Sequence, residues 1–121
     1  MGLAAGILLV FISIAHNIFG EKKQIPDLKR ITSDSIIIGS QRIMIFQGGV
    51  LLFVAGVFQI LVSLELIDLI GVGRYFLIGF VFVNFFTALI ITIFIHKEIL
   101  KITIPQFFIF LIIIILQLLS L

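Results

Sequence analysis

Six polar side chains stand at the borders of long apolar runs, and their types suit hydrogen bonding or metal binding. Imidazole binds zinc, copper, iron and haem, and a carboxylate can complete such a ligand set. Both histidines of the chain are among the six, but neither belongs to an H-x-x-x-H or E-x-x-H pair. We call this group the polar cluster; it comprises His16, Asn17, Glu21, Gln47, His96 and Gln106.

Three interpretations of the polar cluster stay open. In the preferred one, its members satisfy one another at a membrane boundary, where burying polar groups costs least. In the second, they form a hydrogen-bonding pocket for a lipid headgroup, a quinone or a small solute. In the third, His16 and His96 ligate a metal ion or haem, although Lys97 beside His96 would oppose a bound cation. We therefore predict no cofactor and no resident metal.

Three further polar residues, Asn84, Gln59 and Gln117, lie inside the apolar runs, and Asn84 is the deepest. We expect them to be buried and the amide of Asn84 to bond across a helix interface. No Asp, Glu, Lys or Arg lies in the middle of a run, which disfavours proton- or ion-coupled transport. No serine stands beside a histidine in an elbow and no acids are paired, so we assign no catalytic residue and disfavour an enzyme.

The composition is that of a membrane protein. Apolar residues make up 62% of the chain and charged residues 12%, whereas soluble domains carry about 45–50% and about 25%. The mean hydropathy is +1.41. The absence of cysteine excludes disulfides, thiolate metal sites and a cysteine nucleophile. The net charge of +2 is too small to indicate a nucleic-acid partner.

Crossing the roughly 30 Å hydrocarbon core takes about 20 apolar residues in a helix. Four stretches qualify, over residues 2–19, 42–63, 73–95 and 104–120. They predict one transmembrane domain over residues 1–121, an all-α four-helix bundle with antiparallel neighbouring spans. We expect Gly20 to release the first helix, and Thr103 to cap a last helix that carries Pro105 in its first turn.

Seven of the eight lysines and arginines flank the connections at 20–41 and 96–103, and only Arg74 flanks the connection between the second and third spans. The positive-inside rule then makes these two connections cytoplasmic. It predicts a multi-pass protein of the cell (inner) membrane with both termini outside the cytoplasm. On this topology, the whole polar cluster lies at the cytoplasmic end.

Small and polar residues share one stripe on each predicted helix, which predicts a polar seam inside the bundle. Lipid tails are as apolar as leucine, so close backbone packing and interhelical hydrogen bonds must hold the helices together. The glycines expected at these contacts are the Gly2/Gly6 pair and the Gly49/Gly56 pair.

The segment AHNIFGEKKQIPDL resembles the end of the first helix in small bacterial four-helix integral membrane proteins of unassigned function. His16, Gly20 and Glu21 match their His-x-x-x-Gly-Glu motif, and PQFF at 105–108 is similar to the Pro-Gln-aromatic start of their last helix. Those proteins often carry a Trp-His pair early in the second helix. This chain has Phe46-Gln47 there, which weakens the case for a histidine ligand carried over from the family. The resemblance implies the architecture and no activity.

Within this motif, Glu21 could turn back to His16 and form a pH-sensitive latch, although anchoring of the first helix at the cytoplasmic boundary is the plainer function. For the whole chain, the leading prediction is a non-enzymatic membrane component, either an accessory subunit or a homo-oligomer. Its partners are then the bilayer and further copies or a larger membrane complex. The alternatives are a small-solute channel or transporter, a lipid or quinone binder at the cytoplasmic end, and a haem or metal carrier.

Overall fold

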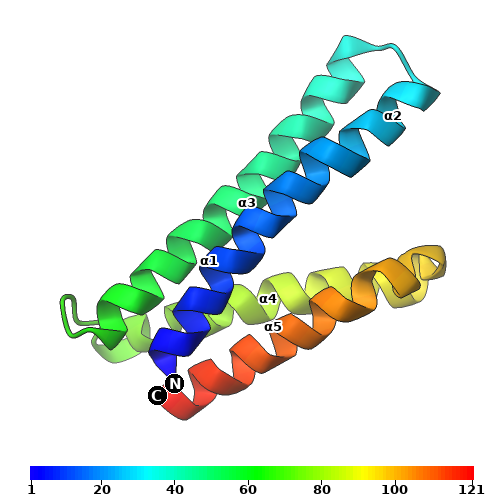
Figure 1. The fold of residues 1–121 in the computed structure, drawn as a ribbon. Coiled ribbons are helices and arrows are strands. Elements are labelled where there is room, and N and C mark those ends of the chain that lie inside the picture. The colour runs from blue at the N-terminus through cyan, green and yellow to red at the C-terminus, as the bar shows by residue number, and fades with distance from the viewer.

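Four long helices make up the chain (Figure 1), which the computed structural model describes over residues 1–121. There are no strands. The helices run over Gly2–Ile31, Ser35–Ser63, Gly71–Ile95 and Lys97–Ser120, and each is long and apolar enough to cross a membrane. The predicted all-α, four-helix class is therefore confirmed, and the helices are those of a multi-pass membrane protein.

The first helix does not end at Gly20. The chain runs from α1 (Gly2–Phe19) through a π-helical turn (Gly20–Gln24) into α2 (Ile25–Ile31). Gly20 keeps right-handed helical dihedrals, and a Cβ there would overlap the side chain of Ile45. The glycine therefore permits a close approach between two helices, and the expectation that it releases the helix is wrong.

The second helix also begins earlier than the predicted span. Only residues 32–34 interrupt the helical chain between α2 and α3, and α3 occupies Ser35–Ser63. The Oδ1 atom of Asp34 accepts a 2.9 Å hydrogen bond from the backbone N–H of Ile36 and so caps the helix. The connection expected over residues 20–41 is thus mostly helical, and charged helix ends extend both spans.

The remaining helices are α4 (Phe76–Ile90) and α5 (Leu100–Ser120). A 3₁₀ turn (Gly71–Tyr75) precedes α4, a π-helical turn (Ile91–Ile95) follows it, and a short 3₁₀ turn (Lys97–Ile99) leads into α5.

Neither residue expected at the start of the last helix has the predicted role. Thr103 lies inside α5, where its hydroxyl donates to the carbonyls of Ile99 and Leu100 at 3.1 and 3.2 Å. Pro105 lies in the helix interior, so the carbonyl of Lys101 lacks its usual helical donor. The helix begins three residues earlier than Thr103 because the chain already turns helically through the preceding 3₁₀ segment.

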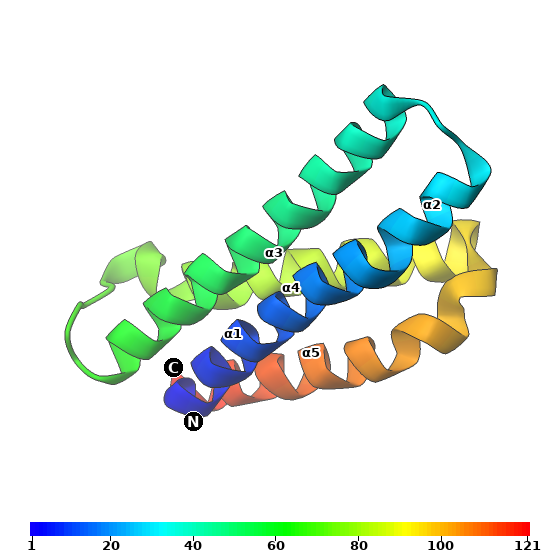
Figure 2. The same cartoon turned by 45° about the horizontal axis from the view of Figure 1, so that its top comes forward.

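The four helices form two antiparallel pairs, α1 with α3 and α4 with α5 (Figures 1 and 2). The pairs meet near the chain termini and diverge toward the other end. Phe85 and Phe107 join α4 to α5 edge to face, with ring centroids 5.7 Å apart. A buried apolar core lies where the pairs meet; it comprises Ala5, Leu9, Ile12, Leu52, Val81, Phe110, Ile113 and Ile114.

All four predicted packing glycines lie at the contact between α1 and α3. A Cβ on Gly6 would lie 3.0 Å from the carbonyl oxygen of Gly56, and a Cβ on Gly56 would lie 3.0 Å from the carbonyl oxygen of Gly6. Gly2 faces the end of α3, and a Cβ at Gly49 would overlap the Asn17 side chain. Because glycine has no side chain, the backbones of α1 and α3 approach each other closely at these positions.

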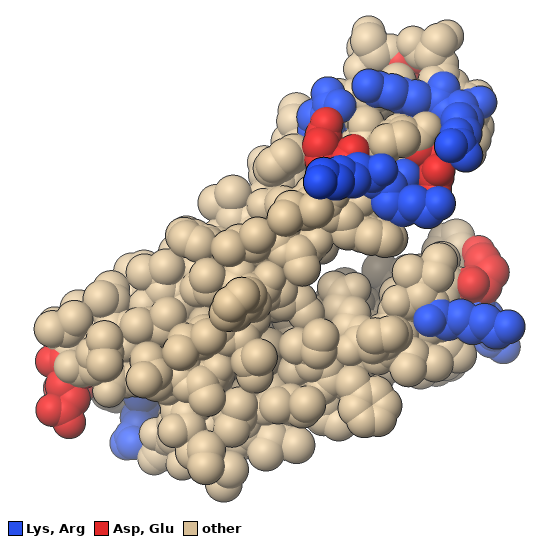
Figure 3. All heavy atoms as spheres, in the orientation of Figure 1, with Lys and Arg blue, Asp and Glu red and all other residues tan.

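The charged side chains gather at the two ends of the molecule (Figure 3). One end, here the basic end, carries α2, the start of α3 and the α4–α5 connection, with seven of the eight lysines and arginines. The other, here the terminal end, holds both chain termini and the α3–α4 connection with Arg74, Glu65 and Asp68. The positive-inside rule predicts that the basic end is cytoplasmic.

A cysteine at position 33 tests this orientation. Ser33 is exposed between α2 and α3, and the chain has no cysteine of its own. Ser33→Cys is expected to react with a membrane-impermeant maleimide only after cells are permeabilised, because the positive-inside rule predicts a cytoplasmic basic end. Leu66→Cys, exposed at the terminal end, is the control and should react in intact cells. The reverse labelling pattern would invert the topology.

Candidate functional site

The polar cluster does not form one site. Glu21 and Arg42 pair with each other at the basic end, with Nε to Oε2 at 3.0 Å and Nη2 to Oε1 at 2.8 Å. Both side chains are about two-fifths exposed, so this bidentate pair fixes α1 against α3 more by geometry than by strength. It is possible because the first helix continues past Gly20 through the π-helical turn, which carries Glu21 to the facing surface of α3.

His16 bonds to α3 and not to Glu21. Its Nε2 lies 3.1 Å from the carbonyl oxygen of Ile45, and since a carbonyl only accepts, Nε2 carries the hydrogen. In the tautomer with its hydrogen on Nε2, Nδ1 is an acceptor. Beside it, Asn17 packs on Gly49, and its buried Oδ1 has no partner. The His16–Glu21 latch, the alternative to simple anchoring of the first helix, is therefore absent, because each group has a different partner on α3.

Gln47 and His96 are exposed. His96 donates through Nδ1 to Oε1 of Glu98 at 2.9 Å, a pair within the α4–α5 connection. No group of three or more His, Asp or Glu side chains is placed to hold a metal ion. The divergence of the two helix pairs explains why these residues are dispersed. Residues at the same level on different helices are not neighbours where the helices lie apart.

Two members of the polar cluster do line a common cavity. His16 and Gln106 face a space of about 440 Å³ between α1 and α5, toward the basic end. Its other walls are mainly apolar and include Phe11, Phe19 and Ile109. This cavity can accommodate an apolar group, with one imidazole and one amide available for hydrogen bonding.

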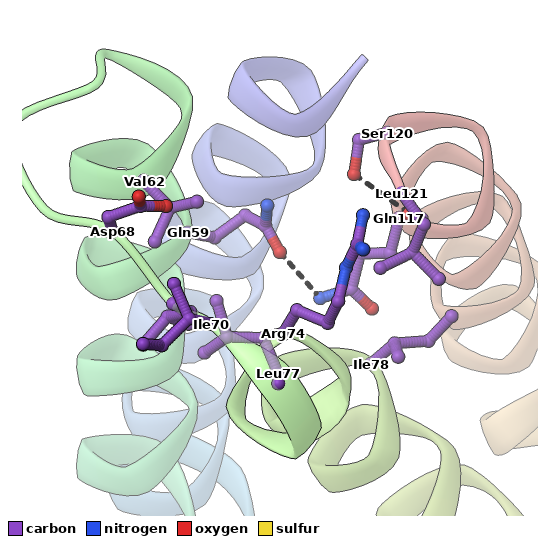
Figure 4. A pocket seen from close by; sticks show the side chains of 12 residues that line it. Gln59, Val62, Asp68, Ile70, Arg74, Leu77, Ile78, Gln117, Ser120 and Leu121 are labelled. Atoms are coloured by element: carbon purple, nitrogen blue, oxygen red, sulfur yellow. Dashed lines mark hydrogen bonds between the residues drawn. The ribbon is translucent and has the colours of Figure 1, made fainter.

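A second cavity, of about 420 Å³, lies at the terminal end; we call it the terminal cavity (Figure 4). It is bounded by the ends of α3 and α5, the start of α4 and the connection that precedes α4. Half of its twelve lining residues are hydrophobic. The polar side chains that line it are Gln59, Asp68, Arg74, Gln117 and Ser120.

Two glutamines on different helices form a polar wall of the terminal cavity. Gln117 donates through Nε2 to Oε1 of Gln59 at 3.0 Å, joining α5 to α3. Gln59 is 6% exposed and Gln117 2% exposed, as expected for polar residues on an inward stripe. Oε1 of Gln117 is buried and has no partner (Figure 4). This oxygen is therefore a buried acceptor that the chain itself leaves without a donor.

The α3–α4 connection supplies opposite charges to the same cavity. Arg74 and Asp68 both line it, and neither takes part in any ion pair of the chain. Gly71 has a φ of +59°, which favours glycine and turns the chain into the 3₁₀ segment that carries Arg74. A cationic and an anionic group are thus both available to a ligand.

Asn84 is placed differently from the other two deep amides. It lies on the exposed face of α4, and its Nδ2 donates to the carbonyl of Phe80 in its own helix at 3.0 Å. Its expected burial and its expected bond across a helix interface are therefore not found within the chain. Thr87 and Ala88, on the same stripe, are exposed as well.

The sequence pattern favoured a site at the basic end and gave Arg74 and Asp68 no part in it. A signal was nevertheless present. Gln59 lies four residues before the end of α3 and Gln117 three before the end of α5. Both amides therefore lie about one turn from the terminal end, where Arg74 is the only basic side chain.

Comparisons with protein families, curated proteins and solved structures found no match to this chain. Function is therefore inferred from the two cavities and the surface of the helices.

Proposed function

We propose that this multi-pass membrane protein is a non-enzymatic binding protein whose terminal cavity takes the zwitterionic headgroup of a lipid-like amphiphile. One observation carries the proposal. Gln117, whose buried Oε1 has no partner, lines a cavity that is also lined by Arg74 and Asp68, neither of which takes part in an ion pair. A small number of convergent polar groups among apolar walls is typical of a ligand site.

The chemistry of the walls defines the headgroup. A phosphate suits Arg74, because guanidinium binds phosphate oxygens through two hydrogen bonds. A primary ammonium has three donors, which can serve Oε1 of Gln117 and the carboxylate of Asp68. Apolar side chains such as Leu77 and Ile78 line the same space and suit the glycerol and acyl portion. A phosphoethanolamine headgroup combines these features.

The packing does not favour a channel. A channel requires a continuous polar path, whereas the apolar core separates the terminal cavity from the cavity beside His16. Leu9, Val81 and Ile113 in this core have no exposed surface. Both cavities are therefore better suited to holding a molecule at a membrane boundary than to passing one through.

Lipid retention tests the proposal. The detergent-purified protein is mixed separately with phosphatidylethanolamine, phosphatidylcholine and phosphatidylglycerol, and bound lipid is counted by native mass spectrometry. We expect phosphatidylethanolamine to be retained about tenfold better than phosphatidylcholine, whose quaternary nitrogen has no N–H to donate. Arg74→Gln should lower this retention about tenfold, because it removes the phosphate partner.

Lys101→Gln is the matched control, since it removes an exposed positive charge at the basic end and should leave retention unchanged. A lipid and a free solute can both supply the phosphoethanolamine group, and competition with soluble glycerophosphoethanolamine distinguishes them. Displacement at low concentration indicates a free solute as the ligand, and resistance indicates the lipid. Equal retention of all three lipids, or equal behaviour of the Arg74 and Lys101 variants, would refute the proposal.

A further inference from the structure

The cavity between α1 and α5, which we call the lateral cavity, has no part in the function proposed above. It lies toward the basic end, where the two helix pairs diverge (Figures 1 and 3). None of its ten lining residues is Asp, Glu, Lys or Arg, in contrast to the terminal cavity. Phe11 and Ile102 in its walls are 68% and 65% exposed, so an apolar molecule can reach it from the bilayer.

The two polar side chains of the lateral cavity have unused hydrogen-bonding groups. Gln106 is partly buried and makes no hydrogen bond within the chain. His16 is also partly buried, and because its Nε2 is engaged with the carbonyl of Ile45 on α3, Nδ1 is its remaining polar atom. Polar groups without a partner are costly among apolar walls.

Pro105 adds a backbone acceptor to the same wall. It lines the lateral cavity, and because proline has no N–H it leaves the carbonyl of Lys101 without its usual helical donor. The nearby hydroxyl of Thr103 does not replace this donor, since it bonds to the carbonyls of Ile99 and Leu100. Residues four apart share a helix face, so the free carbonyl lies one turn from Pro105 on the side of α5 that bounds the cavity.

The balance of these groups defines the ligand. The Lys101 carbonyl, Nδ1 of His16 and Oε1 of Gln106 are acceptors, whereas only the amide nitrogen of Gln106 donates. A hydroxyl suits this set, because it donates to one acceptor and accepts from the amide. A quinone offers only carbonyl acceptors, and an acyl tail offers no polar group. The absence of a charged side chain from the walls disfavours an ionic headgroup, since a buried charge needs a partner.

We propose that the lateral cavity binds a neutral lipid alcohol, an apolar molecule whose only polar group is a hydroxyl. The hydroxyl lies at the wall formed by His16, Gln106 and the Lys101 carbonyl, and the hydrocarbon body lies against Phe11 and Phe19 and extends into the bilayer. The site shares no lining residue with the terminal cavity. It is therefore a second site, independent of the headgroup site proposed above.

Photoaffinity labelling in reconstituted vesicles tests this site. The protein is labelled with a diazirine derivative of farnesol, a neutral isoprenoid alcohol, in competition with farnesol or with its methyl ether, which has no O–H to donate. We expect the label on peptides from α1 and α5, and about fivefold stronger competition by farnesol than by the ether, as one hydrogen bond predicts. Equal competition would show that only the apolar body is bound and would overturn the inference.

Two variants separate binding from folding. Gln106→Leu removes an amide that bonds to nothing else in the chain and should lower labelling about fivefold. Pro105→Ala returns an N–H to the Lys101 carbonyl, which makes α5 more regular and should nevertheless lower labelling about threefold. Gln47→Leu, which replaces an exposed glutamine outside the cavity, is the matched control. Unchanged labelling in either of the first two variants, or an equal loss in the control, would refute the site.

Arg74→Gln distinguishes this site from the headgroup site. Arg74 lines the terminal cavity alone, so the variant should retain less phosphatidylethanolamine and still be labelled as strongly as the original chain. Loss of labelling in this variant would show that both ligands occupy one site and would contradict a separate lateral site.

Discussion

Gly56→Val is expected to destabilise the protein by about 1–3 kcal/mol, because it forces apart the backbones of α1 and α3. A Cβ at this position would lie 2.9 Å from the backbone nitrogen of Val10 and 3.0 Å from the carbonyl oxygen of Gly6. These are backbone atoms, which cannot move aside as a flexible side chain can. Unfolding of single molecules by magnetic tweezers in bicelles gives the free energy of unfolding directly.

Gly39→Val is the control in the same helix. A Cβ at Gly39 meets nothing within 4 Å, and valine has a higher intrinsic helix propensity than glycine. The free energy of unfolding should therefore stay unchanged or rise slightly. Equal destabilisation by the two variants would contradict the contact between Gly6 and Gly56 as the cause of the effect.

Gln117→Leu is expected to lower the free energy of unfolding by about 1 kcal/mol or more, because Oε1 of Gln59 loses its donor while it remains buried. The double variant Gln59→Leu/Gln117→Leu should recover most of this loss, since removing both partners leaves no unsatisfied group. The same tweezers measurement on the two single variants and the double variant gives the coupling energy of the pair.

Gln47→Leu is the control for these glutamine variants. Gln47 is exposed, so its replacement leaves no buried group unpaired and should change the free energy of unfolding little. Additive effects of the two substitutions would contradict an interhelical bond between Gln59 and Gln117. The double variant also separates stability from binding, because it should fold nearly as well as the original chain and yet lose selectivity for phosphatidylethanolamine.

The number and type of the helices could be predicted from the sequence, because hydropathy and span length are local properties of the chain. The separation of charge between the two ends could be predicted for the same reason. The helix ends could not. Gly20 reads as a terminator, but its close contact with Ile45 keeps it helical, and Glu21 then reaches Arg42 instead of His16.

The inward or outward direction of each polar stripe was decided only by the tertiary structure. Gln59 and Gln117 turn inward and bond to each other, whereas Asn84, on an equally polar stripe, is exposed. The helical period fixes angles between residues of one helix but not the rotation of that helix against its neighbours.

In a soluble protein, burial of the apolar face sets this rotation. In a membrane both the bundle interior and the lipid are apolar, so hydropathy leaves the rotation open. Contacts between specific surfaces decide it, such as the approach of Gly6 to Gly56. The sequence by itself therefore determined how many times the chain crosses the membrane and where its charges lie. Packing between helices determined which polar groups meet around a cavity and which are exposed on the helix surface.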